Sequence, residues 1–389
     1  MSNALERVAI VGVGYSQVGR RLPLSDDELV RQAITAAMDD AGLEVADIDG
    51  ISTMGGDAMR MGHLLGIMPL NFFFTSSQLA PAFAEPAVMA IASVASGLSH
   101  TCVAVRLIRQ LGPANPAARG DEEAAGPRPP AHVSGDAQFS APFGGGAPAP
   151  TIGGLQMQRH MAQYGTTELH FAHNAVTARS HAALNSDAIF RDPLTVEDYL
   201  SSRYVSKPLR LLDCDYPVDS ASAVIFTTEA RARDRRSKPV MVESYALSAV
   251  RDFDMALLDD FVRNATVTCA DSLWSRTDLT PADVDCAQLY DGFSVITFEW
   301  LEALGFCGPG EAGPFVAEGN TRLGGRLPLN TDGGACNVGR RHGANFCIEA
   351  VRQLRGECGE RQVPDAELAC VNGTSGWFTA TGTVILGRD

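Results

Sequence analysis

Two stretches of this 389-residue sequence share a pattern that decides the fold. Residues 41–54 read AGLEVADIDGISTM, and residues 277–290 read TDLTPADVDCAQLY. Each contains Leu, Asp, a branched apolar residue and Asp at the same spacing, beginning at Leu43 in the first and at Leu279 in the second. In both stretches the pattern predicts the end of a helix, a short turn and the start of a buried strand.

A second pair of similar stretches follows in the same order. MAIASVASG predicts a helix that ends at Gly97, and AVRQLRG predicts one that ends at Gly356. Two matches in one order indicate a duplicated half, and strands that alternate with helices favour α/β layers. We therefore predict an N-terminal half over residues 1–240 and a C-terminal half over residues 241–389.

The N-terminal half carries extra sequence. The segment from about residue 112 to residue 150 is rich in Pro, Ala and Gly, and its apolar residues show no helical or strand periodicity. This composition predicts a flexible loop. Residues of about 151–215 follow with helix, turn and strand signals, which predicts a cap region inserted into this half. In the first strand, Gly12 and Gly14 predict close packing. A dinucleotide site is not expected, because Gln17 stands where its third glycine is needed.

Composition excludes several classes of function. The net charge of −15 argues against a nucleic-acid partner, because phosphate binding needs a basic surface. Apolar runs long enough to span a membrane, about 18 residues, do not occur, and the N-terminus lacks the features of a signal peptide. The nine Cys are scattered without metal-ligand spacing, which predicts free, buried thiols in a reducing cytoplasm.

A candidate site lies in NTDGGACNVGRRHG, residues 330–343. A Gly-rich turn there precedes Arg340, Arg341 and His342, and a helix follows them. The N-terminus of a helix is already positive, so cations at this place cost stability unless something negative binds. The arrangement predicts a site for an anion, or for a reaction that develops negative charge.

Longer phrases carry a family resemblance over nearly the whole chain. The phrases are YGTTELHFAHNAVTARSHAALNSDAIFRDPLTVEDYL, KPLRLLDCDYPVDSASAVIF, LYDGFSVITFEWLEALGFCGPGEAGPFV, LPLNTDGGACNVGRRHG and EAVRQLRGECGERQV. They resemble the thiolase superfamily, in its sterol-carrier-protein and lipid-transfer-protein branch. The resemblance implies a thiolase fold of five layers, α-β-α-β-α, in two duplicated halves with an inserted cap region.

The sequence departs from this family at every position of thiolase chemistry. The nucleophilic Cys of the family falls at Ala80, and there is no Cys from residue 76 to residue 91. Arg340 stands where the family's Gly-His-Pro-x-Gly loop has its His. The base position near the C-terminus falls at residues 371–373, which contain neither Cys nor His. An acyl-enzyme at the usual place is therefore not expected.

The same departures resemble the steroid side-chain aldolases of this branch. These enzymes lack the nucleophilic Cys, carry a Tyr at the position of Tyr290 and cleave a β-hydroxyacyl-CoA by a retro-aldol reaction. The resemblance implies an acyl-CoA substrate, a homodimer and a partner protein with an OB fold and a zinc ribbon. It implies no cofactor, because CoA is part of the substrate. The chain differs in one respect, since these aldolases have a second catalytic Tyr where Arg340 stands.

Four residues are candidates for this chemistry. Tyr290 is expected to act as base or acid, and a nearby Arg340 would lower its pKa and help to hold the enolate oxygen. His342 is expected to relay a proton. Asp291 either takes part in catalysis or caps the helix that follows it. Each has a structural alternative: a half-buried aromatic for Tyr290, a surface ion pair for Arg340 and a helix-turn position for His342.

Two other functions remain open on the sequence. Cys336 as a displaced nucleophile would make the chain a thiolase or acyltransferase, although an inert buried thiol is the commoner fate. A non-catalytic scaffold that binds acyl-CoA is the second. The apolar stretch NFFFTSSQLAPAF, residues 71–83, would suit a bulky, steroid-like acyl group or the core of a dimer interface.

Overall fold

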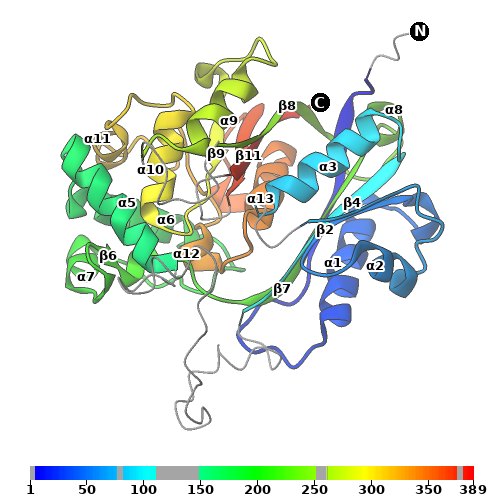
Figure 1. Cartoon of the computed structure of the whole chain (residues 1–389), viewed down its shortest axis with the longest axis horizontal. Coiled ribbons are helices and arrows are strands. Elements are labelled where there is room, and N and C mark those ends of the chain that lie inside the picture. Colours follow the sequence, from blue (N-terminus) through cyan, green and yellow to red (C-terminus); the bar gives the residue numbers. More distant parts are fainter. Residues whose placement is uncertain (1–4, 77–81, 111–148, 251–259, 261, 375–379) are drawn as a thin grey trace.

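The computed structural model describes residues 5–76, 82–110, 149–250, 260, 262–374 and 380–389 (Figure 1). Nine strands of this part of the chain form one mixed sheet in the order β3-β2-β4-β7-β1-β8-β11-β10-β9. The strands are β1 (Val8–Tyr15), β2 (Gly50–Met54), β3 (Phe72–Thr75), β4 (Thr101–Arg109), β7 (Asp219–Thr228), β8 (Val240–Ala249), β9 (Cys286–Gln288), β10 (Leu368–Thr374) and β11 (Ala380–Arg388).

The predicted duplication is present in the strand pairing. In the N-terminal half β2 runs parallel to β4, β4 antiparallel to β7, and β7 antiparallel to β1. In the C-terminal half β9 runs parallel to β10, β10 antiparallel to β11, and β11 antiparallel to β8. The two sets meet where β1 pairs with β8. The boundary at residue 240 stays a prediction, because the sheet is continuous there.

The shared sequence pattern has a structural purpose in each half. A 3-10 turn precedes the strand in both, η1 (Val45–Asp47) before β2 and η6 (Pro281–Asp283) before β9. The carboxylate of Asp49 then accepts hydrogen bonds from the backbone N–H groups of His100 and Thr101, both at 2.9 Å, where β4 begins. Asp285 accepts from Glu367 and Leu368 at 2.8 and 2.9 Å, where β10 begins. The final Asp of each stretch thus fastens the neighbouring parallel strand.

The helices complete five layers, as predicted, because the two halves of the sheet, joined within the described residues by the two residue pairs of β1 and β8, lie on either side of a central helical layer. The central layer consists of α3 (Ala84–Ala95) and α13 (Ala344–Arg355), which pack against strands of both halves. Figure 1 shows them between β2 and β4 on one side and β9 and β11 on the other. The outer faces are covered by α1 (Asp26–Ala41) and α2 (Ala58–Leu65) in one half and by α9 (Ala265–Trp274) in the other. Shorter or peripheral helices are α8 (Glu229–Ala232), α10 (Ser294–Ala303), α11 (Ala312–Ala317) and α12 (Ala335–Val338).

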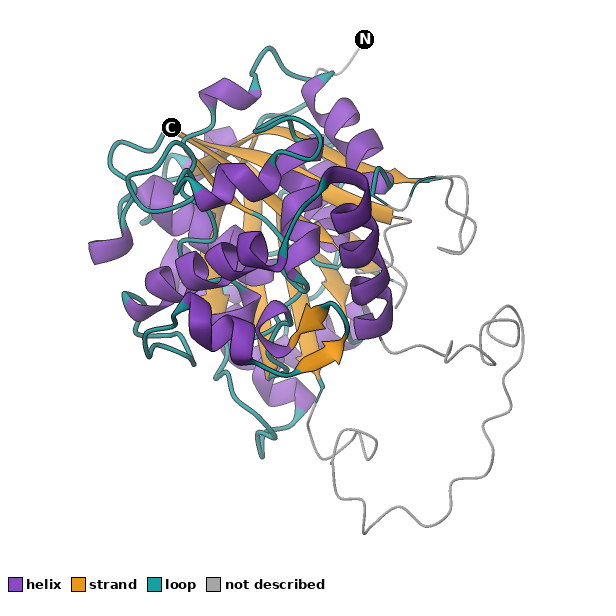
Figure 2. Ribbon diagram, turned by 90° about the vertical axis from the view of Figure 1, so that its left-hand side faces the viewer, coloured by secondary structure: helices purple, strands orange, loops and turns teal. Residues whose placement is uncertain are grey.

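A cap lies between β4 and β7, on the side of the molecule that Figure 2 brings forward. It contains α5 (Ala149–Tyr164), α6 (Glu168–Ala183), α7 (Val196–Ser201), the two-stranded sheet of β5 (Tyr204–Ser206) and β6 (Leu209–Arg210), and η4 (Leu211–Asp213). The loop predicted at about 112–150 lies almost wholly outside the described residues. Within the described residues, no helix is both long and apolar enough to cross a membrane.

Small side chains allow the outer helix of the N-terminal half to touch the sheet. A Cβ atom on Gly12 would lie 2.2 Å from the carbonyl oxygen of Ala37 on α1, and one on Gly14 would lie 2.5 Å from the backbone nitrogen of Ala37. The close packing predicted for these two glycines is therefore confirmed. All nine Cys are free and most are buried, as predicted, whereas the cytoplasmic location stays a prediction.

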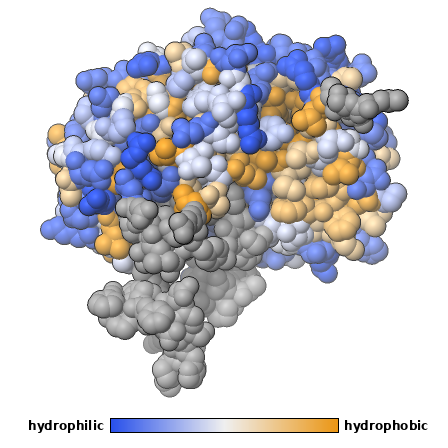
Figure 3. Space-filling view, turned by 45° about the horizontal axis from the view of Figure 1, so that its top comes forward, coloured by the Kyte–Doolittle hydropathy of each residue, from blue (hydrophilic) through white to orange (hydrophobic). Residues whose placement is uncertain are grey.

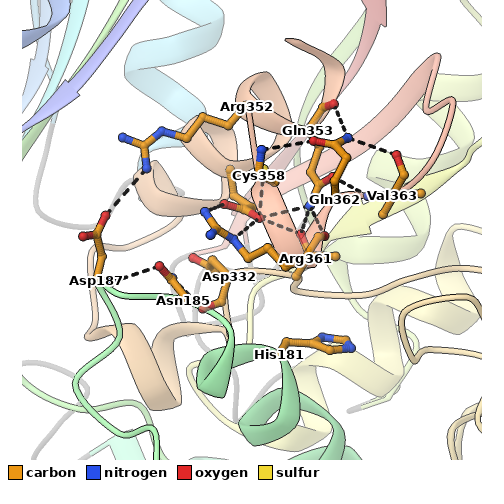
Figure 4. A network of polar contacts seen from close by, with 12 residues as sticks. His181, Asn185, Asp187, Asp332, Arg352, Gln353, Cys358, Arg361, Gln362 and Val363 are labelled. Atoms are coloured by element: carbon orange, nitrogen blue, oxygen red, sulfur yellow. Dashed lines mark hydrogen bonds and ion pairs between the residues drawn. The ribbon is translucent and has the colours of Figure 1, made fainter. Parts of the chain in front are cut away.

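A buried polar network holds the loop before α12 against α13, and Figure 4 shows the part around Gln353 and Arg361. Glu349 on α13 is buried and accepts hydrogen bonds from Arg361 Nε at 3.0 Å, Thr331 Oγ1 at 2.8 Å and Gln353 Nε2 at 3.2 Å. Thr331 in turn accepts from Gln288 Nε2, at the end of β9, at 2.9 Å. One carboxylate therefore fixes the loop relative to both the central helix and a strand.

We predict that Glu349→Gln lowers the free energy of unfolding by about 3–5 kcal/mol, because it leaves Arg361, whose side chain is only 11% exposed, without its carboxylate. Glu28→Gln is the matched control: it breaks an ion pair with Arg31 on the exposed face of α1 and should change stability little. Urea denaturation followed by circular dichroism measures both. Equal shifts in the two midpoints would contradict the structural role of Glu349.

Candidate active site

Three segments distant in sequence meet at the candidate site. They are residues 214–216 before β7, residues 290–293 after β9, and residues 335–343 around α12. The backbone N–H of Asp215 donates to the carbonyl of Gly292 at 3.1 Å, and that of Tyr216 donates to Ala335 at 3.2 Å. The N–H of Arg340 returns a hydrogen bond to the carbonyl of Tyr216 at 2.8 Å. The first segment thus fixes the positions of the other two.

Tyr290 lies buried at the centre of these segments. Its backbone N–H donates to Asn372 Oδ1 at 2.7 Å, and its hydroxyl donates to Asp215 Oδ2 at 3.4 Å. Burial first and the Asp215 charge second raise the pKa of Tyr290 well above its ordinary value, and Arg340 opposes this only in part. Arg340 therefore lowers this pKa, as expected, but burial and the Asp215 charge outweigh its effect. Tyr290 is a neutral phenol that can donate a proton.

Arg340 lies beside an acid that the sequence did not single out. Its Nε is 3.4 Å from Asp215 Oδ1 and donates to Gln110 Oε1 at 2.8 Å. Asp215 has a side chain that is only 7% exposed. Burial raises the pKa of Asp215 to about 6, while Arg340 and the Tyr290 hydroxyl favour its ionised form. The guanidinium of Arg340 is thus engaged with a buried carboxylate and not with a surface one.

His342 is held in the left-handed region, with a φ of 52°, by a tight turn before α13. Its Nδ1 lies 2.7 Å from Nη2 of Arg106, a buried residue of β4. Because a guanidinium can only donate, Nδ1 accepts and the ring proton is on Nε2. Burial, then Arg106 and Arg340, lower the pKa of His342 well below its ordinary value. The imidazole is therefore neutral, with one N–H available as a donor.

Asp291 does not cap the helix that follows it. The residue before α10 is Phe293, and that helix start has no side-chain cap. Asp291 Oδ1 instead accepts from the backbone N–H of Ala335 at 2.9 Å, at the start of α12. Its other oxygen occupies the space where a Cβ atom of Gly334 would lie, at 2.1 Å. Burial raises the pKa of Asp291 to about 8, with Asp332 and Asp215 adding to the effect.

Cys336 and Arg341 prove to be poor candidates for chemistry. The thiol of Cys336 lies 3.4 Å from the carbonyl oxygen of Asp291, and burial raises the pKa of Cys336 well above its ordinary value. A thiolate, which a nucleophilic Cys needs, is therefore disfavoured. Arg341 is buried, with its guanidinium 4.6 Å from the ring centre of Tyr15. Arg340, Arg341 and His342 thus have three separate environments, and His342 is not a cation.

A cleft of about 480 Å³ opens beside these residues. Asp215 and Cys336 form part of its wall, and three arginines, Arg20, Arg179 and Arg203, line it as well. Its volume is in the range of small-molecule sites. The guanidiniums provide the donors that anionic ligands require. Asp215 lines the cleft itself, and the hydroxyl of Tyr290 and the guanidinium of Arg340 contact this carboxylate from behind the wall.

The apolar stretch of residues 71–83 has a different position. β3 is at the edge of the sheet, and the side chain of Phe73 is 56% exposed. The three Phe of β3 do not line the cleft. Ala80, where the family's nucleophile would fall, lies outside the described residues.

Three residues that sequence reasoning missed are central to the site. Asp215 was inside a quoted phrase, but its neighbours gave no motif. Arg106 had a usable signal, because it is a charge inside the apolar run of β4, and buried charges of this kind need a partner. Asn372 holds the backbone of Tyr290, and its buried Nδ2 has no hydrogen-bond partner within the described residues.

Comparisons with known proteins place the chain in a family. The family model "Thiolase C-terminal domain-like" matches residues 248–388. The chain is 35% identical, over 98% of its length and 99% of the relative, to a 17-hydroxy-3-oxo-4-pregnene-20-carboxyl-CoA lyase of Mycobacterium tuberculosis. It is 32% identical, over 98% of both chains, to a steroid side-chain-cleaving aldolase of Thermomonospora curvata.

A solved structure agrees with these matches. An Ltp2-ChsH2(DUF35) aldolase superposes with a TM-score of 0.87 at 32% identity, over 100% of this chain and 99% of the other. The shared fold and the length of the matches leave one assignment. The chain belongs to the thiolase superfamily, in the sterol-carrier and lipid-transfer-protein branch that includes the steroid side-chain aldolases.

Proposed function

We propose that the protein is a carbon–carbon lyase that cleaves the CoA ester of a steroid side chain by a retro-aldol reaction. The observation that carries the proposal is the site itself. It brings together a buried phenol, a carboxylate and a neutral imidazole, whereas the nearby thiol of Cys336 is disfavoured as a thiolate. Its relatives over nearly the whole chain are named as enzymes of this reaction class.

The reaction needs proton transfer and charge stabilisation, but no covalent intermediate. The β-hydroxyl loses its proton, the Cα–Cβ bond breaks, and a carbonyl forms at Cβ. The electron pair moves to the thioester as an enolate, which then takes a proton at Cα. The products are a ketone or aldehyde and a shorter acyl-CoA. The reaction requires no cofactor, since CoA is part of the substrate.

His342 is suited to stabilise the enolate. With Nδ1 occupied by Arg106, its Nε2–H is the donor that can face the thioester oxygen. A neutral imidazole in this role avoids a fixed charge in a buried site, as in other enzymes that polarise a carbonyl. The Nδ2 of Asn372, which has no hydrogen-bond partner among the described residues, is a second donor of the same kind. This assignment replaces the proton relay that we expected of His342.

Tyr290 is suited to the protonation step. Its raised pKa keeps the proton on the hydroxyl until the enolate carbon develops negative charge. Asp291 lies one residue further on and acts by holding the start of α12, because its side chain is directed at Ala335 and Gly334. Arg340 acts on Asp215, to which its guanidinium is bound.

The arginine-lined cleft is suited to the CoA part of the substrate. Arg179 is fixed there by a hydrogen bond from its Nε to Asn337 Oδ1 at 2.6 Å, next to Cys336. The phosphates of CoA are anions that guanidinium groups bind well. Phosphates bound at Arg20, Arg179 and Arg203 would share this cleft with Asp215.

A homodimer would cover the edge of the sheet. β3 pairs with β2 on one side, and its other edge has no partner strand among the described residues. Exposed apolar side chains surround it at Met59, Leu64, Met68 and Phe73. Figure 3 shows apolar residues gathered on the right, where Figure 1 places α2, β2 and α3. An apolar edge strand invites pairing with a second strand, so we propose that β3 forms the dimer interface.

A second protein completes the proposed assembly. The solved relative is named an Ltp2-ChsH2(DUF35) aldolase, a name that combines two proteins. We propose a partner of this type, with an OB fold and a zinc ribbon, for the present chain as well.

The reaction is tested by mass spectrometry on the protein co-expressed with such a partner. The substrate is 17-hydroxy-3-oxo-4-pregnene-20-carboxyl-CoA, the compound in the name of the M. tuberculosis relative, without free CoA. We expect a 17-ketosteroid and propionyl-CoA. Tyr290→Phe should reduce kcat about 10²–10⁴-fold, because it removes the proton donor.

Two results would support other functions. Cleavage that begins only when free CoA is added would indicate a thiolase, in which CoA is a co-substrate. Substrate binding without turnover of this or shorter β-hydroxyacyl-CoAs would indicate a scaffold.

The dimer is tested by analytical ultracentrifugation. We expect wild-type protein to sediment as a dimer and Phe73→Lys as a monomer, because a charge would be buried at the centre of the interface. Leu155→Lys is the control. Leu155 has a similar exposure, 57%, but it belongs to α5 of the cap and not to the edge of the sheet that contains β3. Dissociation by both variants, or by neither, would contradict the role of β3.

A further inference from the structure

We propose that Asp215 is the general base that removes the β-hydroxyl proton of the substrate, and that Arg340 is the residue that positions it. This inference rests on the proposed lyase function and identifies the residue that begins the reaction. The sequence motifs gave that role to Tyr290.

The geometry gives Asp215 access that a nearby carboxylate lacks. Asp215 lines the cleft, whereas Asp213, two residues earlier, does not. Both oxygens of Asp213 accept from the hydroxyl of Tyr199 at 2.8 Å, which occupies that carboxylate inside the cap. The Asp215 oxygens have longer contacts, 3.4 Å to Tyr290 and 3.4 Å to Arg340, so they can accept a further hydrogen bond from a substrate hydroxyl.

The backbone of Asp215 is fixed as a base requires. Its N–H is bound to Gly292, and the next residue is bound to both Ala335 and Arg340. The carboxylate is therefore held between the turn that carries Tyr290 and the turn that carries His342. A general base needs this precision, because proton transfer requires hydrogen-bond distance to the substrate hydroxyl.

The charges around Asp215 suit a base that works near neutral pH. Burial raises the pKa of Asp215 to about 6, and Arg340 and Tyr290 limit the rise. It is thus largely ionised at pH 7 and still basic enough to take a proton. The charged and titratable groups around it are Arg340, Tyr290, Asp291, Asp213, Cys214 and Cys336, with Arg20, Arg179 and Arg203 on the cleft.

Asp215 and Tyr290 together can accept and return every proton that the reaction moves. Asp215 takes the proton of the β-hydroxyl as the Cα–Cβ bond breaks and the enolate forms. Tyr290 gives its proton to Cα, and protonated Asp215 returns a proton to the Tyr290 oxygen along their hydrogen bond. The enzyme ends in its starting state, and one proton has moved from the β-oxygen to Cα.

Arg340 has a defined part in this scheme. The resemblance gives the steroid aldolases a catalytic Tyr at this position, and a guanidinium cannot accept a proton in its place. Here the side chain binds Asp215 and Gln110 instead. The carboxylate that Arg340 binds can accept a proton, which Arg340 itself cannot.

Asp215→Asn tests the proposal in the lyase assay with the partner protein present. We expect kcat to fall about 10²–10⁴-fold while the dissociation constant of the substrate, measured by calorimetry, changes little. Asp215→Glu should recover part of the activity. The matched control is Asp213→Asn, which removes a buried carboxylate of the same loop and should stay within a few-fold of wild type once its melting temperature shows that it is folded.

The pH dependence gives a second readout that a structural role would not move. The base must be ionised, so kcat/KM should fall as the pH drops below about 6. In Arg340→Gln the cation that lowers the Asp215 pKa is gone. The acid limb of the profile, which is the fall of kcat/KM at low pH, should therefore move to higher pH, even if the maximal rate is lower as well.

The outcomes separate the base assignment from the lyase function. If wild type cleaves the substrate and Asp215→Asn does so at a similar rate, the function holds and Asp215 is not the base. An equal loss in Asp213→Asn, or an acid limb that does not move in Arg340→Gln, overturns the assignment as well. If wild type cleaves nothing, the lyase function fails and the base assignment fails with it.

Discussion

The backbone hydrogen bonds of residues 215 and 216 are the constraint on which the site depends. They join a segment that leads into the N-terminal half of the sheet to two turns of the C-terminal half. Together with the direct hydrogen bond from Ala335 to Asp291, they fix the separation of the turns that carry Tyr290 and Arg340. Because the contacts are made by backbone atoms, the side chains at these positions remain free for chemistry. The site is thus built where the two halves of the duplicated fold meet.

Burial decides the chemistry of this site more than the identity of the residues does. Tyr290 keeps its proton, His342 stays neutral, and Asp215 is weakly acidic for a carboxyl group, each because water is excluded. Arg106 and Arg340 then set the finer details, the tautomer of the imidazole and the ionisation of the carboxylate. A thiolase loop whose nucleophile has been lost can therefore support proton transfer with ordinary side chains.

The sequence revealed the fold more fully than the site, for a physical reason. The pattern shared by the duplicated stretches ends at Asp49 and Asp285, which form hydrogen bonds with the start of the adjacent strand. This structure is local, so a local sequence pattern was enough to predict it. Tyr290 and His342 were found because they stand in family loops. Asp215 and Arg106 were missed because their roles come from contacts across the fold. Arg340 lowers the pKa of Tyr290 as expected, but burial outweighs this effect, and sequence spacing does not reveal burial.

The cap interrupts only one of the two halves. It enters between β4 and β7, whereas the corresponding strands of the other half, β10 and β11, are joined after a short gap in the sequence. The N-terminal half of the duplicated fold therefore contains an insertion that the C-terminal half lacks between its corresponding strands. Substitutions in residues 149–213 can reshape the ligand cleft while the turns at 290–293 and 339–343 keep their geometry. A change of ligand preference through the cap would therefore leave the candidate catalytic residues in place.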